Sequence, residues 1–416
     1  GRQLAARGNC AGCHTAEGGA AYAGGRALET PFGTVYATNL TPDPATGIGR
    51  WSFSAFQRAM REGVSHDGRM LYPAFPYTAF TRMTDDELTA LYAHLMSQPA
   101  VAQVTPATEL RAPFHLRPLM HLWNALHLQP GPRTLPATTL ATLPAGVDAA
   151  LWQRGEYLVN GPGHCGACHT PRDATGAEQT GSAYLSGAWV DGWHAPSLTT
   201  LNRRTLPWTE SALLGYLKHG HSTAHGVAVG PMAQVVGSLQ GAPEQDLRAM
   251  AHYLATLQGG AAQQGAAGQP RAESPTAGPD AALVTRLATD AVARARALAP
   301  LPDATQRLFE GACGACHSDG QAPVELGLNL PLATNSKLQA DEPDNLLRVL
   351  LDGIQRPATH DIGFMPGFRH ALDDAQLAEL ALWLRRRYAP DHPAWPGPQA
   401  LRERVAQVRG APRSDR

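Results

Sequence analysis

One five-residue pattern occurs three times in the chain and uses every cysteine. The copies are Cys10-Ala-Gly-Cys13-His14, Cys165-Gly-Ala-Cys168-His169 and Cys313-Gly-Ala-Cys316-His317. C-x-x-C-H is the attachment signature of a c-type haem, because two thiols one helical turn apart form thioethers to the porphyrin vinyl groups and the adjacent histidine ligates the iron. We therefore predict three covalent haem c groups, bound through all six cysteines, with an iron ligand from each of His14, His169 and His317.

Other readings of six cysteines explain the pattern less well. A disulfide framework rarely repeats one pattern three times over 416 residues. A redox C-x-x-C pair expects a strand before it and no fixed histidine after it. Structural zinc needs four ligands, whereas each copy supplies two cysteines and one histidine. Because haem c is assembled outside the cytoplasm, we predict a periplasmic chain, with attachment to the outer face of the cytoplasmic membrane as a variant of this location.

Charge and hydropathy argue against a nucleic-acid-binding protein and against a membrane-spanning one. The chain has 34 Lys+Arg against 35 Asp+Glu, so a charge-driven nucleic-acid partner is not expected. No window approaches the roughly 20 apolar residues that a membrane span needs. Since Gly1 lies just before the first motif, we expect any export signal to have been removed already. A membrane surface remains among the partners that the sequence allows.

The three motifs mark a threefold internal repeat, and their spacing suits tandem domains with linkers. In each repeat a short helix leads into the motif (3–7, 151–159 and 305–311), a middle helix ends at glycine (Gly63, Gly220 and Gly353), and an amphipathic helix closes the unit (84–98, 244–258 and 373–388). Few strand signals appear. We predict an all-α fold of three class I cytochrome c-like domains, at 1–98, 150–258 and 301–390, with linkers at 99–149 and 259–300 and a tail at 391–416.

Several connecting segments carry their own expectations. Thr84 and Glu87 form a capping box that fixes the start of the first closing helix. The stretch 115–128 is read as a linker helix packed across domains, with a membrane or partner face as the alternative. Residues 259–279 are of low complexity, 280–299 are helical, and the tail is expected to be a solvated or partner-wrapping end.

The sixth iron ligand is sought among eight methionines, because methionine closes the far side of the iron in many electron carriers. In the third repeat Met365 has no competitor. In the second, Met232 is preferred because Met250 lies within the closing helix, where packing explains it. In the first, Phe75 stands where the third repeat has Met365, and Met83, just before the capped helix, is favoured over Met70. If neither coordinates, His66 or an open site remains.

Several other residues have a less specific functional interpretation. Asn39, Trp51, Trp193 and Trp208 lie in loops expected to wrap the haem edges, where they would hold propionates, although core packing explains each tryptophan equally well. His219, His221 and His225 cluster in sequence, but no carboxylate or fixed spacing accompanies them, so a solvated loop is the better reading.

Long stretches beyond the motifs resemble the tri-haem cytochrome c subunits of periplasm-facing bacterial alcohol, gluconate and aldehyde dehydrogenases. These stretches are YAGGRALETPFGTVYATNLTPDPATGIGRWS (22–52), LYPAFPYTAFTRMTDDEL (71–88), YLVNGPGHCGACHTPR (157–172) and MPGFRHALDDAQLAEL (365–380). Members of the alcohol dehydrogenase kind tend to read PAMPY where this chain has PAFPY, while keeping a methionine at position 83, so the resemblance favours Met83. The PAFPYT motif and the LMHLWNALHL connector are more similar to the sequences of cytochrome partners of xanthine-oxidase-type molybdenum hydroxylases. Those enzymes act on aldehydes or N-heterocycles such as nicotinate.

The resemblance implies an electron-transfer subunit without a catalytic site of its own. Its partners would be a catalytic dehydrogenase subunit of the molybdopterin, flavin or PQQ type, an iron-sulfur subunit where one exists, and ubiquinone, a downstream cytochrome or a terminal oxidase. No Rossmann glycine fingerprint and no spare cysteine compete with this reading. The alternatives are a peroxidase-like haem enzyme with an open first haem beneath Phe75, and a free-standing multihaem shuttle.

Overall fold

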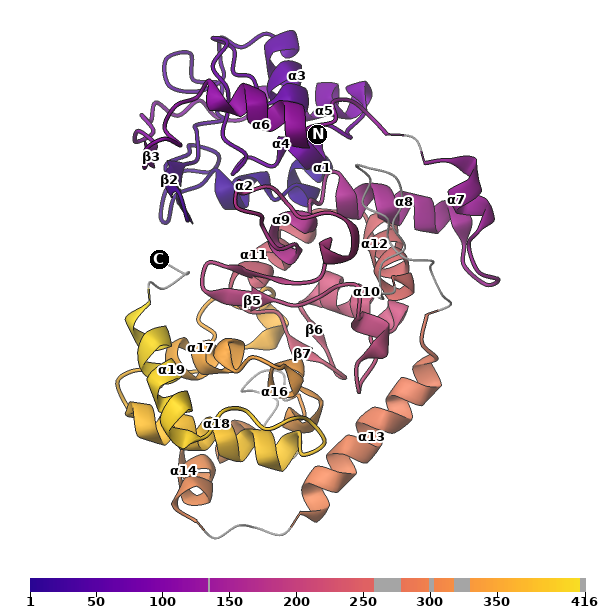
Figure 1. Ribbon diagram of the computed structural model, residues 1–416, viewed down its shortest axis with the longest axis vertical. Helices are drawn as coiled ribbons and strands as arrows, with labels where there is room; N and C mark the ends of the chain where they lie inside the picture. The colour runs from indigo at the N-terminus through magenta and orange to yellow at the C-terminus, as the bar shows by residue number, and fades with distance from the viewer. Residues whose placement is uncertain (134, 258–277, 299–302, 318–329, 412–416) are drawn as a thin grey trace. The chain divides into compact units, whose positions relative to one another are not determined.

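The computed structural model describes residues 1–133, 135–257, 278–298, 303–317 and 330–411 (Figure 1). The low-complexity stretch expected at 259–279 therefore lies almost entirely outside the described residues. Contacts between Cα atoms divide the chain into two compact units. The first holds 1–188 and 238–253, and the second holds 189–237, 254–257 and the chain from 276 onward.

Short helices dominate the first unit. They are α1 (Arg2–Arg7), α2 (Cys10–Cys13), α3 (Phe53–Glu62), α4 (Tyr77–Phe80), α5 (Asp85–Met96), α6 (Leu119–His127), α7 (Ala137–Ala141), α8 (Ala149–Asn160), α9 (Gly166–His169) and η1 (Gly181–Ala183), together with most of α12 (Glu244–Thr256). The predicted capping box of α5 is confirmed, because the Thr84 hydroxyl accepts from Glu87 N and the Glu87 carboxylate accepts from Thr84 N, both at 3.2 Å. The glycine stop of α3 is confirmed too, with Gly63 at φ 66°.

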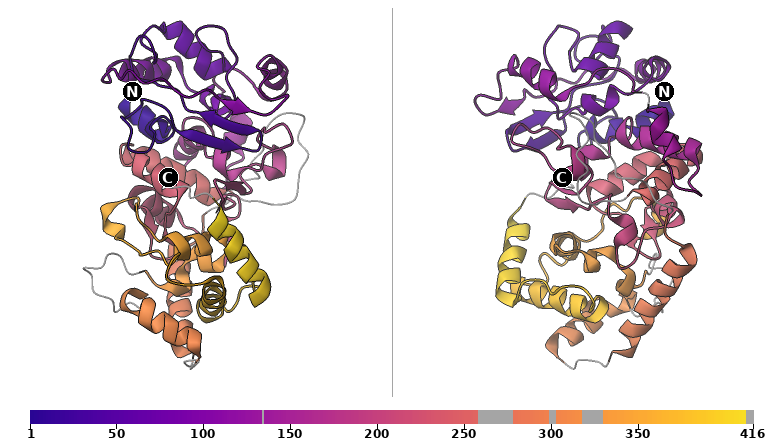
Figure 2. Two further views of the ribbon diagram at one scale, coloured as in Figure 1. Left: turned by 90° about the vertical axis from the view of Figure 1, so that its left-hand side faces the viewer. Right: turned by 45° about the vertical axis from the view of Figure 1, so that its right-hand side comes forward.

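A small antiparallel sheet was not predicted. It has the order β1 (Ala27–Thr30), β2 (Gly33–Tyr36) and β3 (Glu109–Leu110), and its first two strands form a hairpin visible in the left view of Figure 2. Gly33, which begins β2 directly after the turn, and the β-branched pair Thr34 and Val35 are a hairpin signal that helical periodicity does not detect. The third strand comes from the predicted linker 99–149 and is too short to leave any pattern in the sequence.

Helix α6 packs across two of the predicted domains, as expected for a linker helix. Its Trp123 indole donates to Thr175 O at 3.1 Å. Its Asn124 donates to Glu62 O at 2.8 Å and accepts from the Tyr77 hydroxyl at 2.7 Å. The preferred interpretation of 115–128 is therefore confirmed, although the helix begins only at Leu119.

Buried ion pairs tie the first two predicted domains into one unit. The Arg82 guanidinium donates to both carboxylate oxygens of Glu156 on α8 at 2.7 Å, and both side chains are almost fully buried. Arg7 on α1 contacts Asp246 on α12 at 2.6 Å and is equally buried. Such pairs hold geometry firmly, because removal of either partner leaves an uncompensated charge in a low-dielectric interior.

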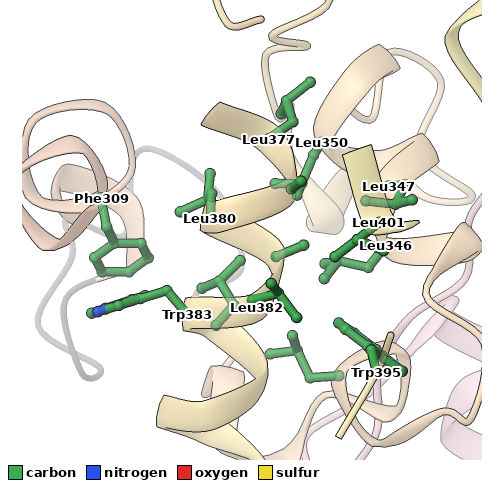
Figure 3. Close-up of a cluster of buried hydrophobic side chains, with 14 of the residues drawn as sticks. Phe309, Leu346, Leu347, Leu350, Leu377, Leu380, Leu382, Trp383, Trp395 and Leu401 are labelled. Atoms are coloured by element: carbon green, nitrogen blue, oxygen red, sulfur yellow. The ribbon is translucent and has the colours of Figure 1, made fainter. Parts of the chain in front are cut away.

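The second unit contains the remaining elements. They are β5 (Trp193–Ala195), η2 (Leu201–Arg203), α10 (Glu210–His219), β6 (His221–Ser222), β7 (Gly226–Val227), α11 (Pro231–Leu239, most of its length), α13 (Ala281–Ala297), α14 (Ala304–Ala312), α15 (Gly314–His317), η4 (Leu332–Thr334), α16 (Ser336–Gln339), α17 (Asp344–Asp352), η5 (His360–Ile362), α18 (Asp374–Tyr388) and α19 (Pro398–Gly410). Strand β4 (Ala188–Val190) pairs with β5. The core gathers along α18, where Leu380 and Trp383 face Phe309 of α14 (Figure 3). Among the described residues, no helix is both long and apolar enough to cross a membrane.

The C-terminal segment corrects one expectation. Instead of a solvated tail, residues 398–410 form α19, which lies along α18 (Figures 1 and 2). Leu401, Val405 and Val408 are buried in the core of the unit. The Arg409 guanidinium donates to Asp374 at 2.7 Å. The three apolar residues follow helical spacing, a signal that the proline-rich and basic composition of the tail obscured.

The Arg82–Glu156 pair gives a test of how the first unit is held together. We expect Glu156→Gln to lower the free energy of unfolding by about 3–5 kcal/mol, because it leaves the buried Arg82 charge unpaired. Asp391→Asn is the matched control, since the Arg294–Asp391 pair is 54% and 62% exposed. It should cost less than about 1 kcal/mol. Urea unfolding followed by circular dichroism measures both, and equal effects would contradict a structural role for the buried pair.

Candidate haem sites

Each predicted attachment motif lies on a one-turn helix that follows a longer leading helix. The pairs are α1 with α2, α8 with α9 and α14 with α15. None of the six cysteines forms a disulfide bond in the structure. In the described part of the chain, no group of three or more His, Cys, Asp or Glu side chains is arranged to hold a metal ion. The geometry therefore supports neither the disulfide nor the zinc reading.

The first thiol of each motif is shielded from water. Burial, reinforced by the neighbouring cysteine, raises the pKa of Cys10 and of Cys165 to about 12, and the pKa of Cys313 to about 11. Nucleophilic redox cysteines have a lowered pKa instead. A raised pKa at the first cysteine does not fit a thioredoxin-like pair.

His14 is held in the tautomer that suits an iron ligand. Its Nδ1 lies 2.6 Å from the carbonyl oxygen of Thr38. A carbonyl only accepts, so Nδ1 carries the proton and Nε2 keeps the lone pair. Burial lowers the pKa of His14, which keeps the ring neutral. No sequence signal pointed to Thr38, because the contact depends on the path of a loop.

The structure separates the two methionine candidates of the first repeat. Met83 is 1% exposed and belongs to a core cluster that Cys10 also contacts. Met70 packs in a different cluster, against Met120 and Trp123. The loop that carries Met83 is anchored by the Arg61 guanidinium, which donates to Met83 O at 2.9 Å.

The contacts of the other first-repeat candidates do not single out an iron ligand. Met60 and Met96 also join the Met83 cluster, from the helices α3 and α5. The His66 ring lies 4.9 Å from the ring of Trp51. Phe75 packs against Phe80, with ring centroids 5.5 Å apart, so it fills space in the core.

The residues of the second predicted site fall in different units. His169 ends α9 in the first unit, where its carbonyl accepts from Gly187 N at 2.8 Å. Met250 on α12 is 3% exposed, and its terminal methyl would lie 3.3 Å from a Cβ added at Gly163. Tight packing thus accounts for Met250. Met232 belongs to the second unit, where it is half-buried in the first turn of α11.

The third predicted site is a cavity within the second unit. The space between protein atoms here is about 1270 Å³ when the solvent at its open mouth is counted. Its lining brings together all four residues predicted for this haem, Cys313, Cys316, His317 and Met365. Most other lining residues are apolar, and the buried Nδ1 of His317 has no hydrogen-bond partner among the described residues. Two thiols, an imidazole and a thioether in an apolar cavity fit a covalent haem.

A close backbone contact holds Met365 in the cavity wall. Ile354 N donates to Met365 O at 2.9 Å, and Met365 N donates to Ile354 O at 3.3 Å. The contact requires Gly353, at φ 71°, because a Cβ there would lie 2.2 Å from Met365 O. The glycine predicted only as a helix stop therefore also positions the methionine.

Two of the weaker predictions are revised by their contacts. Backbone groups of two segments occupy the Asn39 side chain, which donates to Val101 O at 2.8 Å and accepts from Thr41 N in its own loop at 2.9 Å. It holds the fold rather than a propionate. His225 is not on a solvated loop but 1% exposed, stacked on Trp208 at 3.8 Å, and burial lowers its pKa to about 3.

Comparison with known proteins gives the family. Residues 1–99 and 153–258 match Cytochrome c, and residues 300–384 match Cytochrome C oxidase, cbb3-type, subunit III. The gluconate 2-dehydrogenase cytochrome c subunit of Pantoea cypripedii is 35% identical over 401 residues, covering 92% of this chain and 84% of the relative. The alcohol dehydrogenase (quinone) cytochrome c subunit of Gluconobacter oxydans is 34% identical over 410 residues, covering 94% of this chain and 79% of the relative. The chain belongs to the cytochrome c subunits of dehydrogenases.

This membership confirms the resemblance and the mostly helical cytochrome fold expected from the sequence. The cytochrome is also 50% identical over 414 residues to a nicotinate dehydrogenase subunit of Pseudomonas putida, a match that covers 100% of this chain. The chain spans only 32% of that relative's length.

Two glycines of the third repeat give a test of the Met365 contact. We expect Gly353→Ala to destabilise the cytochrome by at least about 1–2 kcal/mol, because its left-handed backbone disfavours a side chain and the added Cβ meets Met365 O. Gly311→Ala, on α14 with nothing within 4 Å, should be neutral or stabilise by about 0.5–1 kcal/mol. Thermal or urea unfolding measures the stability of both variants. An unchanged stability of Gly353→Ala would show that the contact is dispensable.

Proposed function

We propose that this cytochrome carries electrons through three covalent haem c groups and has no catalytic site of its own. The observation that carries the proposal is the third cavity, whose apolar wall presents Cys313, Cys316, His317 and Met365 together. Cys10, Cys13, Cys165 and Cys168 would attach the other two haems. Their ligand pairs would be His14 with Met83 and His169 with Met232.

The chain's own residues determine how such a cofactor behaves. Bound haem supplies one-electron redox chemistry. His14, held by Thr38, offers a neutral Nε2 to the iron. The buried Met83 would supply a second ligand, and a thioether ligand raises the reduction potential. The apolar packing excludes water and small molecules, which suits transfer of electrons rather than turnover of a substrate.

One contact in the first unit supports transfer between the first two haems. His164 Nε2 donates to Gly8 O at 3.1 Å. Gly8 lies two residues before Cys10, and His164 lies one residue before Cys165, so the two attachment motifs meet at this hydrogen bond. Two haems attached there would be neighbours, a favourable arrangement for electron hopping.

The names of the relatives indicate the class of partner. One is a subunit of nicotinate dehydrogenase, and others are cytochrome subunits of gluconate and quinone-type alcohol dehydrogenases. We place this cytochrome in the periplasm, attached to a catalytic dehydrogenase subunit. A molybdenum hydroxylase for aldehydes or N-heterocycles is favoured, with an iron-sulfur subunit, and flavin or PQQ dehydrogenases of alcohols or sugars come next. Electrons would leave to ubiquinone, another cytochrome or an oxidase.

A haem enzyme with an open first haem is the competing function, and the first-repeat methionines separate the two. We expect carbon monoxide to leave the ferrous wild-type spectrum unchanged, because all three irons carry a methionine. Met83→Ala should open one haem to carbon monoxide. Met70→Ala should leave the protein inert to carbon monoxide, while costing about 2–5 kcal/mol of stability from a lost core side chain.

Rapid mixing of the reduced proteins with carbon monoxide measures these differences. Fast binding to the wild type would favour the haem enzyme. Binding to Met70→Ala but not to Met83→Ala would reassign the first iron ligand to Met70.

A further inference from the structure

Lys337 stands out among the described residues that line the third cavity. Among the described lining residues, Lys337 is the only Lys, Arg, Asp or Glu, and its neighbours on the wall include Leu332, Leu338 and Phe368. The 416-residue sequence contains only one other lysine, Lys218. An ammonium group on an otherwise apolar wall is costly unless a partner compensates its charge.

The described residues supply little of that compensation. Lys337 Nζ donates one hydrogen bond, to Val227 O at 2.7 Å. No described carboxylate forms an ion pair with it. An ammonium group has three N–H donors, so hydrogen-bonding capacity toward the cavity remains. Burial lowers the pKa of Lys337 to about 8, so the charged form is disfavoured where it lies.

The backbone that carries Lys337 is firmly placed. The Asn335 side chain accepts from Lys337 N at 3.0 Å and thereby caps the short helix α16. Ser336 N donates to His225 O at 3.1 Å, and the Thr334 hydroxyl donates to Thr223 O at 3.0 Å. These bonds fasten the segment to the β6–β7 hairpin. The ammonium is thus presented by a fixed support rather than by a loose surface chain.

The chemistry of the expected occupant provides the missing anion. A haem is apolar except for its iron and its two propionate carboxylates, and the iron is already matched by His317 and Met365. A carboxylate with a lysine ammonium forms a charge-assisted hydrogen bond, which is stronger in a low-dielectric cavity than in water. We propose that Lys337 binds a propionate of the third haem, an inference that rests on the proposed function.

This pairing would raise the reduction potential of the third haem. A positive charge beside the porphyrin favours the reduced iron, which carries one positive charge fewer than the oxidised iron. Pairing also neutralises a propionate, whose negative charge would favour the oxidised form. Lys337 is therefore a positioning residue that raises the reduction potential of one haem out of three.

Potentiometric titration of the haem-loaded chain tests this effect. In Lys337→Gln we expect one of the three midpoint potentials to fall by about 59 mV, equivalent to a tenfold weaker one-electron reduction. The other two should stay unchanged. Lys337→Arg should restore most of the loss, and Lys218→Gln, which removes the same charge on α10, should shift none. Unchanged potentials in Lys337→Gln, with three haems attached, would overturn the assignment.

A second measurement uses the wild-type protein and needs no variant to fold. A water-soluble carbodiimide activates a carboxylate, and a lysine amine in contact then forms an amide while the reagent leaves as a urea. Cleavage after glutamate separates residues 311–325, which carry the third haem, from 326–342, which carry Lys337. Mass spectrometry should find these two peptides joined, with no link from Lys218 to a haem peptide. Absence of this link would count against the pairing.

The same digest distinguishes failure of the haem site from failure of the lysine pairing. If residues 311–325 carry no haem before the reagent is added, the proposed third haem fails, and the Lys337 assignment fails with it. If the haem is present but neither the link nor the potential shift is found, only the Lys337 assignment fails.

Discussion

Packing of α14 and α17 against α18 forms both the core of the second unit and the wall of its cavity. Phe309, Leu346 and Leu350 belong to the buried cluster and also line the cavity. Trp383 supports this wall from α18, with its ring 4.9 Å from that of Phe309. The contacts that stabilise the unit are therefore the contacts that would keep water from an iron bound between His317 and Met365.

The first unit relies on charge as well as on apolar packing. Two buried ion pairs between described residues, Arg82–Glu156 and Arg7–Asp246, join the first two predicted domains. The same contact region brings His164 to Gly8, next to two attachment motifs. A carrier that passes electrons between haems needs fixed spacing, and buried pairs supply it because neither partner can leave without exposing a charge to the interior.

Features that depend on local patterns could be predicted from the sequence. Three C-x-x-C-H motifs indicated haem attachment, glycine stops located the ends of α3, α10 and α17, and helical periodicity located α5, α12 and α18. The third cavity brings the predicted His317 and Met365 together, although their ligation of iron stays a prediction.

Features that depend on contacts between distant residues could not be predicted. The bond from His14 to Thr38, the approach of Gly353 to Met365 and the place of Lys337 in the cavity wall each arise from loops that meet in space. The helix α19 was missed for a different reason, because its apolar spacing is sparse and its composition resembles that of a tail. Local patterns thus located the motifs, whereas the residues that surround each motif became known only from the fold.

The measurement that tests the central claim most directly is a stoichiometric reductive titration of the oxidised, haem-loaded chain, followed by its absorption spectrum. We predict that one chain takes up three electrons and that every haem remains low-spin and six-coordinate in both oxidation states. Uptake of fewer than three electrons, or a high-spin haem in the intact chain, would contradict an electron carrier with three closed iron sites.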